Sequence, residues 1–197
     1  MAVLLWRCRC GRGPERSFNK NRGASAPSLG RRSKYSGQSV KAMPMRLLTV
    51  GKKWSRGTQL LVEEYKEKLG IYCDFEDTLI RSNPKLTSDV KVQVEAEDTA
   101  MMQQLKFDDF VVVLDENVKD VISEQIADLI GDAGNTGSSR LTFCIGGPYG
   151  LGAQVLERAD TTIRLSSLVL NHQVALIVLM EQLYRAWTII KGQKYHH

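Results

Sequence analysis

Residues 110–114 read FVVVL, five consecutive apolar residues without the polar alternation of a half-exposed strand. Such a run is typical of a β-strand that is covered on both faces, as in a parallel sheet with a helical layer on each side. The following segment 123–131 has the period of a helix, with Ser123 as its expected N-cap and Gly131 at its end. We therefore expect a strand and a helix that belong to an α/β fold.

The same alternation of strand-like and helix-like segments extends in both directions along the chain. It predicts one α/β domain over residues 45–197, with a mainly parallel sheet and helices on both of its faces. The final helix is not expected to cross a membrane, because residues 174–180 give only seven consecutive apolar residues, against about twenty that a span needs. Strands are expected at 45–50, 72–80, 110–114, 141–145 and 161–165, and helices at 58–70, 88–105, 123–131 and from His172 onward.

The first 44 residues differ from the rest of the chain. They hold ten Lys or Arg and the single acid Glu15, are rich in Ser and Gly, and show no sustained apolar period. This composition is typical of a transit peptide that delivers a protein to the chloroplast or mitochondrion. The alternative is a disordered basic arm on a cytoplasmic protein, where it contacts nucleic acid. In both cases we expect residues 1–44 not to pack, and removal of residues 1–41 to leave folding unchanged.

The distribution of charge and cysteine bears on whether the chain binds phosphate-bearing partners or metals. Residues 45–197 hold seventeen Lys or Arg against twenty-one Asp or Glu, so this part is mildly acidic although the whole chain carries +5. A phosphate-bearing partner must therefore meet a local patch or a composite surface. Cys73 and Cys144 are isolated in apolar surroundings, and no metal-binding or disulfide spacing is present. We expect no bound metal.

Three loops follow strand ends, where ligands bind in open parallel sheets. Residues 114–120 and the glycine-rich residues 146–150 can also be ordinary turns, and they match neither a GxGxxG pattern nor a P-loop. The loop at 166–172 is less usual, because Leu168, Val169 and Leu170 make it apolar. An apolar loop usually covers something, and an adenine ring would suit it.

Several motifs carry a family resemblance. The chain has IGGPYG at 145–150, LSSLVLNH at 165–172, EQLYRA at 181–186 and KYHH at its end, besides VGK at 50–52. In this order and spacing, residues 45–197 resemble the RlmH-type family of SPOUT-class methyltransferases, which methylate N3 of a pseudouridine in large-subunit ribosomal RNA. The resemblance implies S-adenosylmethionine as cofactor, a C-terminal deep trefoil knot, ribosomal RNA of the large subunit as partner, and a homodimer formed through the last helix.

The resemblance also assigns site residues. Asn171 stands where bacterial relatives have proline, Tyr149 where the family often has Glu, and Leu176 where bacterial members often have Arg. The last two differences remove charges near the expected RNA site. On the substrate side the resemblance places His172, Tyr184, Arg185, Tyr195 and His196. The positions that match the cofactor site are Leu114, Gly147, Ser166, Ser167, Leu168, Val169, Leu170 and Asn171.

The chemistry that the resemblance implies needs a group that handles a proton. The N3–H of a uracil-type ring has a pKa of about nine to ten, so its proton must be removed or the ring anion stabilised. Arg185 can supply positive charge, and either His172 or His196 can act as the base. Taken alone, Glu181 and Arg185 also suit a surface pair. A second function therefore stays open, that of a knotted ribosome-binding or assembly factor without turnover.

Overall fold

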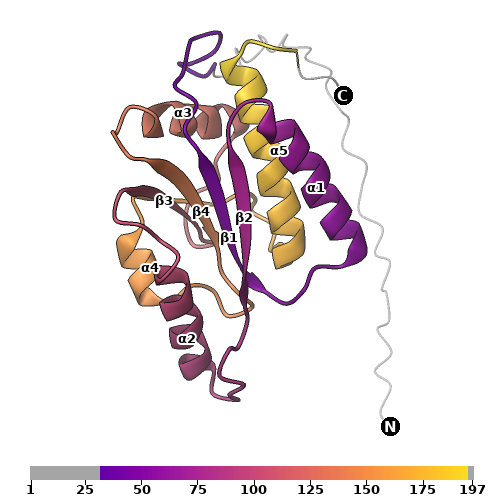
Figure 1. Cartoon of the computed structure of the whole chain (residues 1–197), viewed down its shortest axis with the longest axis vertical. Coiled ribbons are helices and arrows are strands. Elements are labelled where there is room, and N and C mark those ends of the chain that lie inside the picture. Colours follow the sequence, from indigo (N-terminus) through magenta and orange to yellow (C-terminus); the bar gives the residue numbers. More distant parts are fainter. Residues whose placement is uncertain (1–31, 195–197) are drawn as a thin grey trace, which may run out of the picture. The chain divides into compact units, whose positions relative to one another are not determined.

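The computed structural model describes residues 32–194, and a parallel sheet of five strands lies at their centre (Figure 1). The strands lie in the order β2-β1-β4-β3-β5, and every neighbouring pair is parallel. The expectation of an α/β fold with a mainly parallel sheet is confirmed. In chain order the strands are β1 (Met45–Gly51), β2 (Phe75–Arg81), β3 (Asp109–Leu114), β4 (Arg140–Ile145) and β5 (Thr161–Ile163).

Helices cover both faces of the sheet, as the sequence predicts. Three of them pack against one another on one face and two on the other. Among residues 32–194 no helix combines the length and apolar character that a membrane span requires. The first face carries α1 (Arg56–Gly70), α3 (Ser123–Ala133) and α5 (His172–Ile190), and the second carries α2 (Val90–Met102) and α4 (Ala153–Arg158).

The apolar run in β3 is buried from both sides. Val111 and Val113 belong to the apolar cluster beneath α2 and α4, whereas Val112 faces α3 and α5. All three side chains are fully buried. Burial of one such side chain contributes about 1.5–3 kcal/mol, so β3 joins the two apolar layers into one stable unit.

The helix that the sequence predicts at 123–131 differs at both ends. Its N-cap is Ile122, and the Ser123 hydroxyl instead donates to Oε1 of Gln182 in α5 at 2.6 Å. The prediction of Ser123 as N-cap is wrong, because the hydroxyl finds a tertiary partner. The helix also continues through Gly131 to Ala133. Helix α4 has no counterpart among the predicted elements.

Residues 33–43, which we call the N-terminal strap, pack against α3. The Ser33 hydroxyl donates to Asp128 Oδ1 at 2.7 Å, and the Tyr35 hydroxyl donates to Asp132 Oδ1 at 2.8 Å. Met43 is buried in the core. The expectation that nothing before residue 45 packs is wrong for the strap, because it adds side chains to the exposed side of α3. Removal of residues 1–41 deletes most of these contacts.

The Tyr35 ring of the strap leaves no room for a side chain at Gly131. A Cβ atom at this position would lie 2.2 Å from the Tyr35 ring, so Gly131→Ala is expected to lower the free energy of unfolding by about 1–3 kcal/mol. In a Tyr35→Ala background the same change is expected to be neutral or stabilising, because alanine favours a helix over glycine by about 1 kcal/mol. Urea denaturation of the four variants measures this coupling. Equal destabilisation in both backgrounds would contradict the packing of the strap.

Candidate functional site

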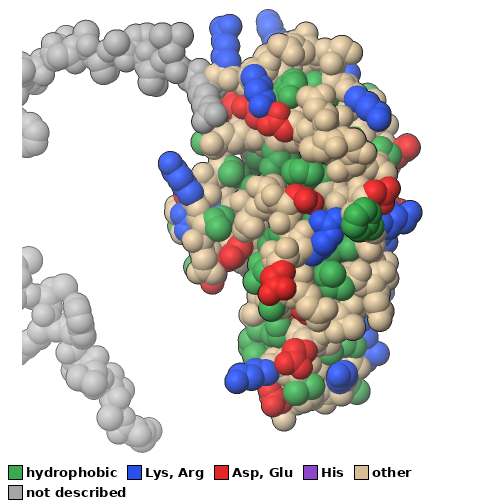
Figure 2. Space-filling view, turned by 90° about the vertical axis from the view of Figure 1, so that its left-hand side faces the viewer, with side chains coloured by type: hydrophobic (Ala, Val, Ile, Leu, Met, Phe, Trp, Pro, Cys, Tyr) green, Lys and Arg blue, Asp and Glu red, His purple; other side chains and the backbone are tan. Residues whose placement is uncertain are grey.

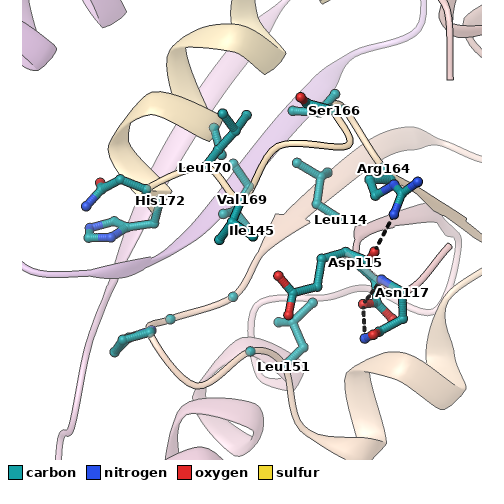
Figure 3. A pocket seen from close by; sticks show the side chains of 18 of the residues that line it. Leu114, Asp115, Asn117, Ile145, Leu151, Arg164, Ser166, Val169, Leu170 and His172 are labelled. Carbon is teal, nitrogen blue, oxygen red and sulfur yellow. Dashed lines mark hydrogen bonds between the residues drawn. The ribbon is translucent and has the colours of Figure 1, made fainter. Parts of the chain in front are cut away.

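A cavity of about 720 Å³ opens at the carboxyl ends of β3, β4 and β5 (Figure 3). Its walls come from the loops at 114–117, 145–151 and 163–172, together with the start of α5. Parallel strands bring their carboxyl ends to one edge of the sheet, which is why loops far apart in sequence meet here. The volume lies in the range of about 300–1,000 Å³ that small-molecule sites have.

Apolar side chains form the middle of the pocket. Leu114, Ile145 and Leu170 lie between His172 at one end and Asp115 at the other (Figure 3). Val169 and Leu168, which precede Leu170 in the chain, are 87% and 73% exposed. Exposed apolar side chains at the mouth of a cavity indicate a ligand with an apolar face, because they gain free energy when a ligand covers them.

A polar network fixes the loop after β3. Arg164 Nε donates to Asp120 Oδ1 at 2.6 Å, and its Nη1 donates to the Glu116 carbonyl at 3.0 Å. The Asp115 carboxylate accepts from the backbone N–H of Asn117 at 2.9 Å. These contacts hold the loop against the end of β5 and leave the carboxylates of Asp115 and Glu116 on one side of the pocket. That side suits a cationic group.

The glycine-rich loop after β4 needs its glycines. Gly150 has φ +84°, a conformation that favours glycine, and its N–H donates to the Gly147 carbonyl at 3.0 Å. A Cβ on Gly146 would lie 2.7 Å from the backbone of Gly150. A Cβ on Gly147 would lie 2.8 Å from Glu97 Oε2. The loop is therefore a tight turn that rests on α2.

Two buried acids of α2 support this turn, and the sequence does not predict them. Glu97 Oε1 accepts from the Asn83 N–H at 2.7 Å and from Gln93 Nε2 at 2.8 Å, while its Oε2 has no hydrogen-bond partner among the described residues. Asp98 accepts from the Val155 N–H at 3.0 Å and so caps α4. The available signal in the sequence is that these two acids lie on the side of α2 that faces the sheet, where acids are unusual.

The start of α5 closes the pocket at the end opposite Asp115. Asn171 caps the helix by accepting from the Gln173 N–H at 2.9 Å, and His172 lines the cavity. The His172 ring faces Gly51 at the end of β1, where a Cβ would lie 3.4 Å from Nε2. The imidazole is thus held between β1 and the pocket.

Comparison with known proteins gives a family. Residues 43–196 match a family model described as "Predicted SPOUT methyltransferase". The chain belongs to this family. It is 64% identical over 168 residues to "Putative RNA methyltransferase At5g10620" of Arabidopsis thaliana, covering 85% of this chain and 87% of that protein.

Two bacterial relatives share the name "Ribosomal RNA large subunit methyltransferase H". The protein of Christiangramia forsetii is 38% identical over 156 residues, covering 79% of this chain and 99% of the relative. The protein of Clostridium beijerinckii is 34% identical over 158 residues, covering 78% of this chain and 99% of the relative. The likeness thus spans nearly the full length of these two relatives.

The pocket of this SPOUT chain gathers most of the residues predicted to hold a cofactor. Ser167 is exposed and does not line the cavity. The fully buried Leu176 packs in the core, so the expectation that position 176 lies at an RNA-facing site is wrong. Tyr149 lies at the mouth and is 54% exposed. The predicted residues that line the cavity are Leu114, Gly147, Ser166, Leu168, Val169, Leu170 and Asn171.

The predicted catalytic residues are not all in one place. His172 lines the pocket, but Arg185 lies thirteen residues further along α5, about 20 Å away along the helix axis. Arg185 Nη1 pairs with Glu181 Oε1 at 3.8 Å. Tyr195 and His196 lie outside the described residues. A role for Arg185 at this pocket therefore requires a second copy of the chain.

The two cysteines among the described residues are buried. Burial raises the pKa of Cys73 and of Cys144 to about 12, so neither thiol ionises near neutral pH. Within residues 32–194 no group of three or more His, Cys, Asp and Glu side chains is arranged to hold a metal ion.

The contact between Gly147 and Glu97 gives a test of the pocket. Gly147→Ala is expected to lower the affinity for S-adenosylmethionine, the cofactor predicted from the sequence, at least about tenfold, because an extra Cβ displaces the turn at a cost of about 1–3 kcal/mol. Gly57→Ala is a matched control, since a Cβ there meets no atom within 4 Å. Isothermal titration of both variants measures the difference. Equal affinities would show that the turn does not shape the binding site.

Proposed function

We propose that this chain is an S-adenosylmethionine-dependent methyltransferase that acts on large-subunit ribosomal RNA, at N3 of a pseudouridine. The pocket at the carboxyl ends of β3, β4 and β5 carries the proposal, because it combines apolar walls with a carboxylate side. The names of the bacterial SPOUT relatives, which the chain matches over 99% of their length, support the ribosomal RNA substrate.

The residues of the pocket fit this cofactor. The exposed Leu168 and Val169 offer an apolar surface for an adenine ring. Asp115 and Glu116 offer negative charge to the cofactor's ammonium and sulfonium groups. The turn at Gly147 lets a ligand approach the backbone, whose N–H and C=O groups can bind its polar edges.

The chemistry divides between cofactor and protein. The bound cofactor supplies a methyl group that is electrophilic because it is attached to a sulfonium. The protein binds the base so that N3 lies in line with that methyl group, and His172 accepts the N3 proton at the edge of the pocket. The apolar walls exclude water, which strengthens electrostatic stabilisation of the ring anion.

A homodimer formed through α5 is part of the proposal. Helices α1 and α5 lie side by side (Figure 1), and exposed apolar side chains remain on both, with Leu60 at 64%, Leu61 at 42% and Val174 at 49% exposure. A two-fold axis across α5 would place the α5 helices of the two subunits side by side in opposite directions. The partner's Arg185 would then lie near His172, which overcomes the 20 Å separation within one chain.

Two further features complete the proposal. The C-terminal segment forms a deep trefoil knot, as the family resemblance implies. The basic N-terminal segment directs the protein to a chloroplast or mitochondrion, supported by its ten Lys or Arg and its single acid within residues 1–44. Because Ser33 is buried against α3, cleavage before this residue would leave the strap in place.

The first test is cofactor binding. The full chain is expected to bind S-adenosylmethionine with a dissociation constant between about 1 µM and 1 mM. Val169→Asp is expected to weaken binding at least about tenfold, because it replaces an apolar contact with a charge. Phe107→Asp is the control, since Phe107 is 99% exposed and precedes β3 at the opposite edge of the sheet. Absence of binding at millimolar ligand would contradict the enzyme and favour the ribosome-binding factor.

The second test is complementation between subunits. Arg185→Ala and His172→Ala are each expected to lower methyl transfer to large ribosomal subunits about a hundredfold, as for loss of a positioned charge or base. In a one-to-one mixture of the two variants, half of the dimers are mixed and each has one intact site, so about a quarter of the wild-type activity should return. Radiolabelled cofactor measures the transfer. No recovery would place Arg185 outside the partner's site.

A further inference from the structure

Five cationic side chains lie at the carboxyl ends of β1 and β2 or within the few residues that follow. Residues 51–56 at the end of β1 and residues 81–88 at the end of β2 contain no Asp or Glu. The next residue, Asp89, is the N-cap of α2, and its carboxylate accepts from the Lys91 N–H at 2.8 Å. The remainder of residues 45–197 holds twelve Lys or Arg against twenty-one Asp or Glu. Positive charge in the acidic domain is therefore concentrated in these two loops, which we call the basic ledge, formed by Lys52, Lys53, Arg56, Arg81 and Lys85.

The ledge cations are available to a partner. All five residues are exposed, and none of the ion pairs found within residues 32–194 uses them. Cations at the opposite edge of the sheet differ, since Arg140 pairs with both Asp109 and Glu76. On the side of the molecule where α2, α3 and α4 are visible, basic and acidic side chains are interspersed (Figure 2). These surfaces present no continuous field of one sign.

The two loops lie beside each other and beside the pocket. Gly51 is the register partner of Arg81, and the Ser82 N–H donates to the Gly51 carbonyl at 3.0 Å. Gly51 is also the residue that faces the His172 ring. Register partners in neighbouring parallel strands point to the same face, so Arg81 lies on the face of the sheet that His172 occupies.

Both loops are held in place before any partner binds. Trp54 packs against the core, and Gln173 Oε1 accepts from the Thr58 hydroxyl at 2.8 Å, which ties α1 to the start of α5. In the second loop, Asn83 Nδ2 donates to the Thr87 carbonyl at 2.8 Å, and the Thr87 N–H donates to Asn83 Oδ1 at 3.0 Å. A preorganised loop loses little entropy when it binds a ligand, so its cations contribute more to affinity.

We propose that the basic ledge binds the phosphate backbone of the RNA next to the pocket, an inference that rests on the proposed function. The His172 end of the pocket borders the ledge, and the Asp115 end carries carboxylates that repel phosphates. The RNA therefore enters across β1 and β2, and its target base reaches the pocket from the His172 side. Contacts of this kind set position and affinity without reading sequence.

Binding of a short fluorescent RNA hairpin of arbitrary sequence, without cofactor, tests the ledge. In the full chain, Lys53→Ala/Arg56→Ala/Lys85→Ala is expected to lower affinity at least about tenfold and to flatten the slope of log affinity against log salt by about 2 to 3, measured from about 50 to 200 mM salt. The control Lys68→Ala/Lys106→Ala/Lys119→Ala removes the same charge from positions outside both the ledge and residues 1–44, and should change affinity less than about twofold. Lys53→Arg/Lys85→Arg should keep the wild-type slope.

The outcomes separate the ledge from the proposed function. If the triple alanine variant of the ledge has the affinity and the salt dependence of the control variant, the ledge does not bind RNA, even if the wild-type chain transfers methyl groups. Loss of binding in the arginine variant would also overturn it, because the positive charge is retained there. If the wild-type chain binds the hairpin through the ledge but does not bind S-adenosylmethionine, the proposed function fails and the ledge stands. Urea denaturation of each variant confirms that it is folded.

Discussion

Double-sided burial of β3 is the constraint on which the rest of the structure depends. Val111 and Val113 face one helical layer and Val112 the other, so the strand can exist only inside a sheet that is covered on both faces. Coverage of both faces by crossover helices makes the strands parallel, and parallel strands end at the same edge. The pocket and the basic ledge lie at that edge because every connection there leaves a strand and enters a helix.

Two buried acids of α2, Glu97 and Asp98, support the glycine-rich turn that borders the pocket. Glu97 and Asp98 are 3% and 4% exposed, and a buried carboxylate is tolerated only when hydrogen bonds replace its water. Asp98 meets this condition by capping α4, whereas Glu97 Oε2 has no hydrogen-bond partner among residues 32–194. A buried oxygen without any partner costs about 1–3 kcal/mol. The oxygen faces Gly147, so the cost lies beneath the turn that shapes the pocket. Buried polar atoms without a partner are rare in folded proteins, so an atom that reaches this oxygen through the pocket would stabilise the turn.

The sequence predicts features with a local signature and misses those that depend on distant contacts. The apolar run in β3 identifies the sheet, and strand ends identify the three loops, because both follow from short stretches of chain. The buried Glu97 looks like part of a solvated helix face until Asn83 and Gln93 are seen around it. The sequence does not reveal the strap for the same reason, since the contact between Ser33 and Asp128 joins residues 95 positions apart.

Net charge is a poor guide to how this protein meets RNA. The +5 of the whole chain combines an excess of nine positive charges in residues 1–44 with an excess of four negative charges in the remainder. At physiological ionic strength the screening length is about 8 Å, so only charges close to the pocket act on a phosphate that enters it. Asp115 and Glu116 repel the phosphate at one end, and the ledge attracts it at the other. The same separation of charge that suits a cationic cofactor therefore also determines the side from which an anionic substrate can approach.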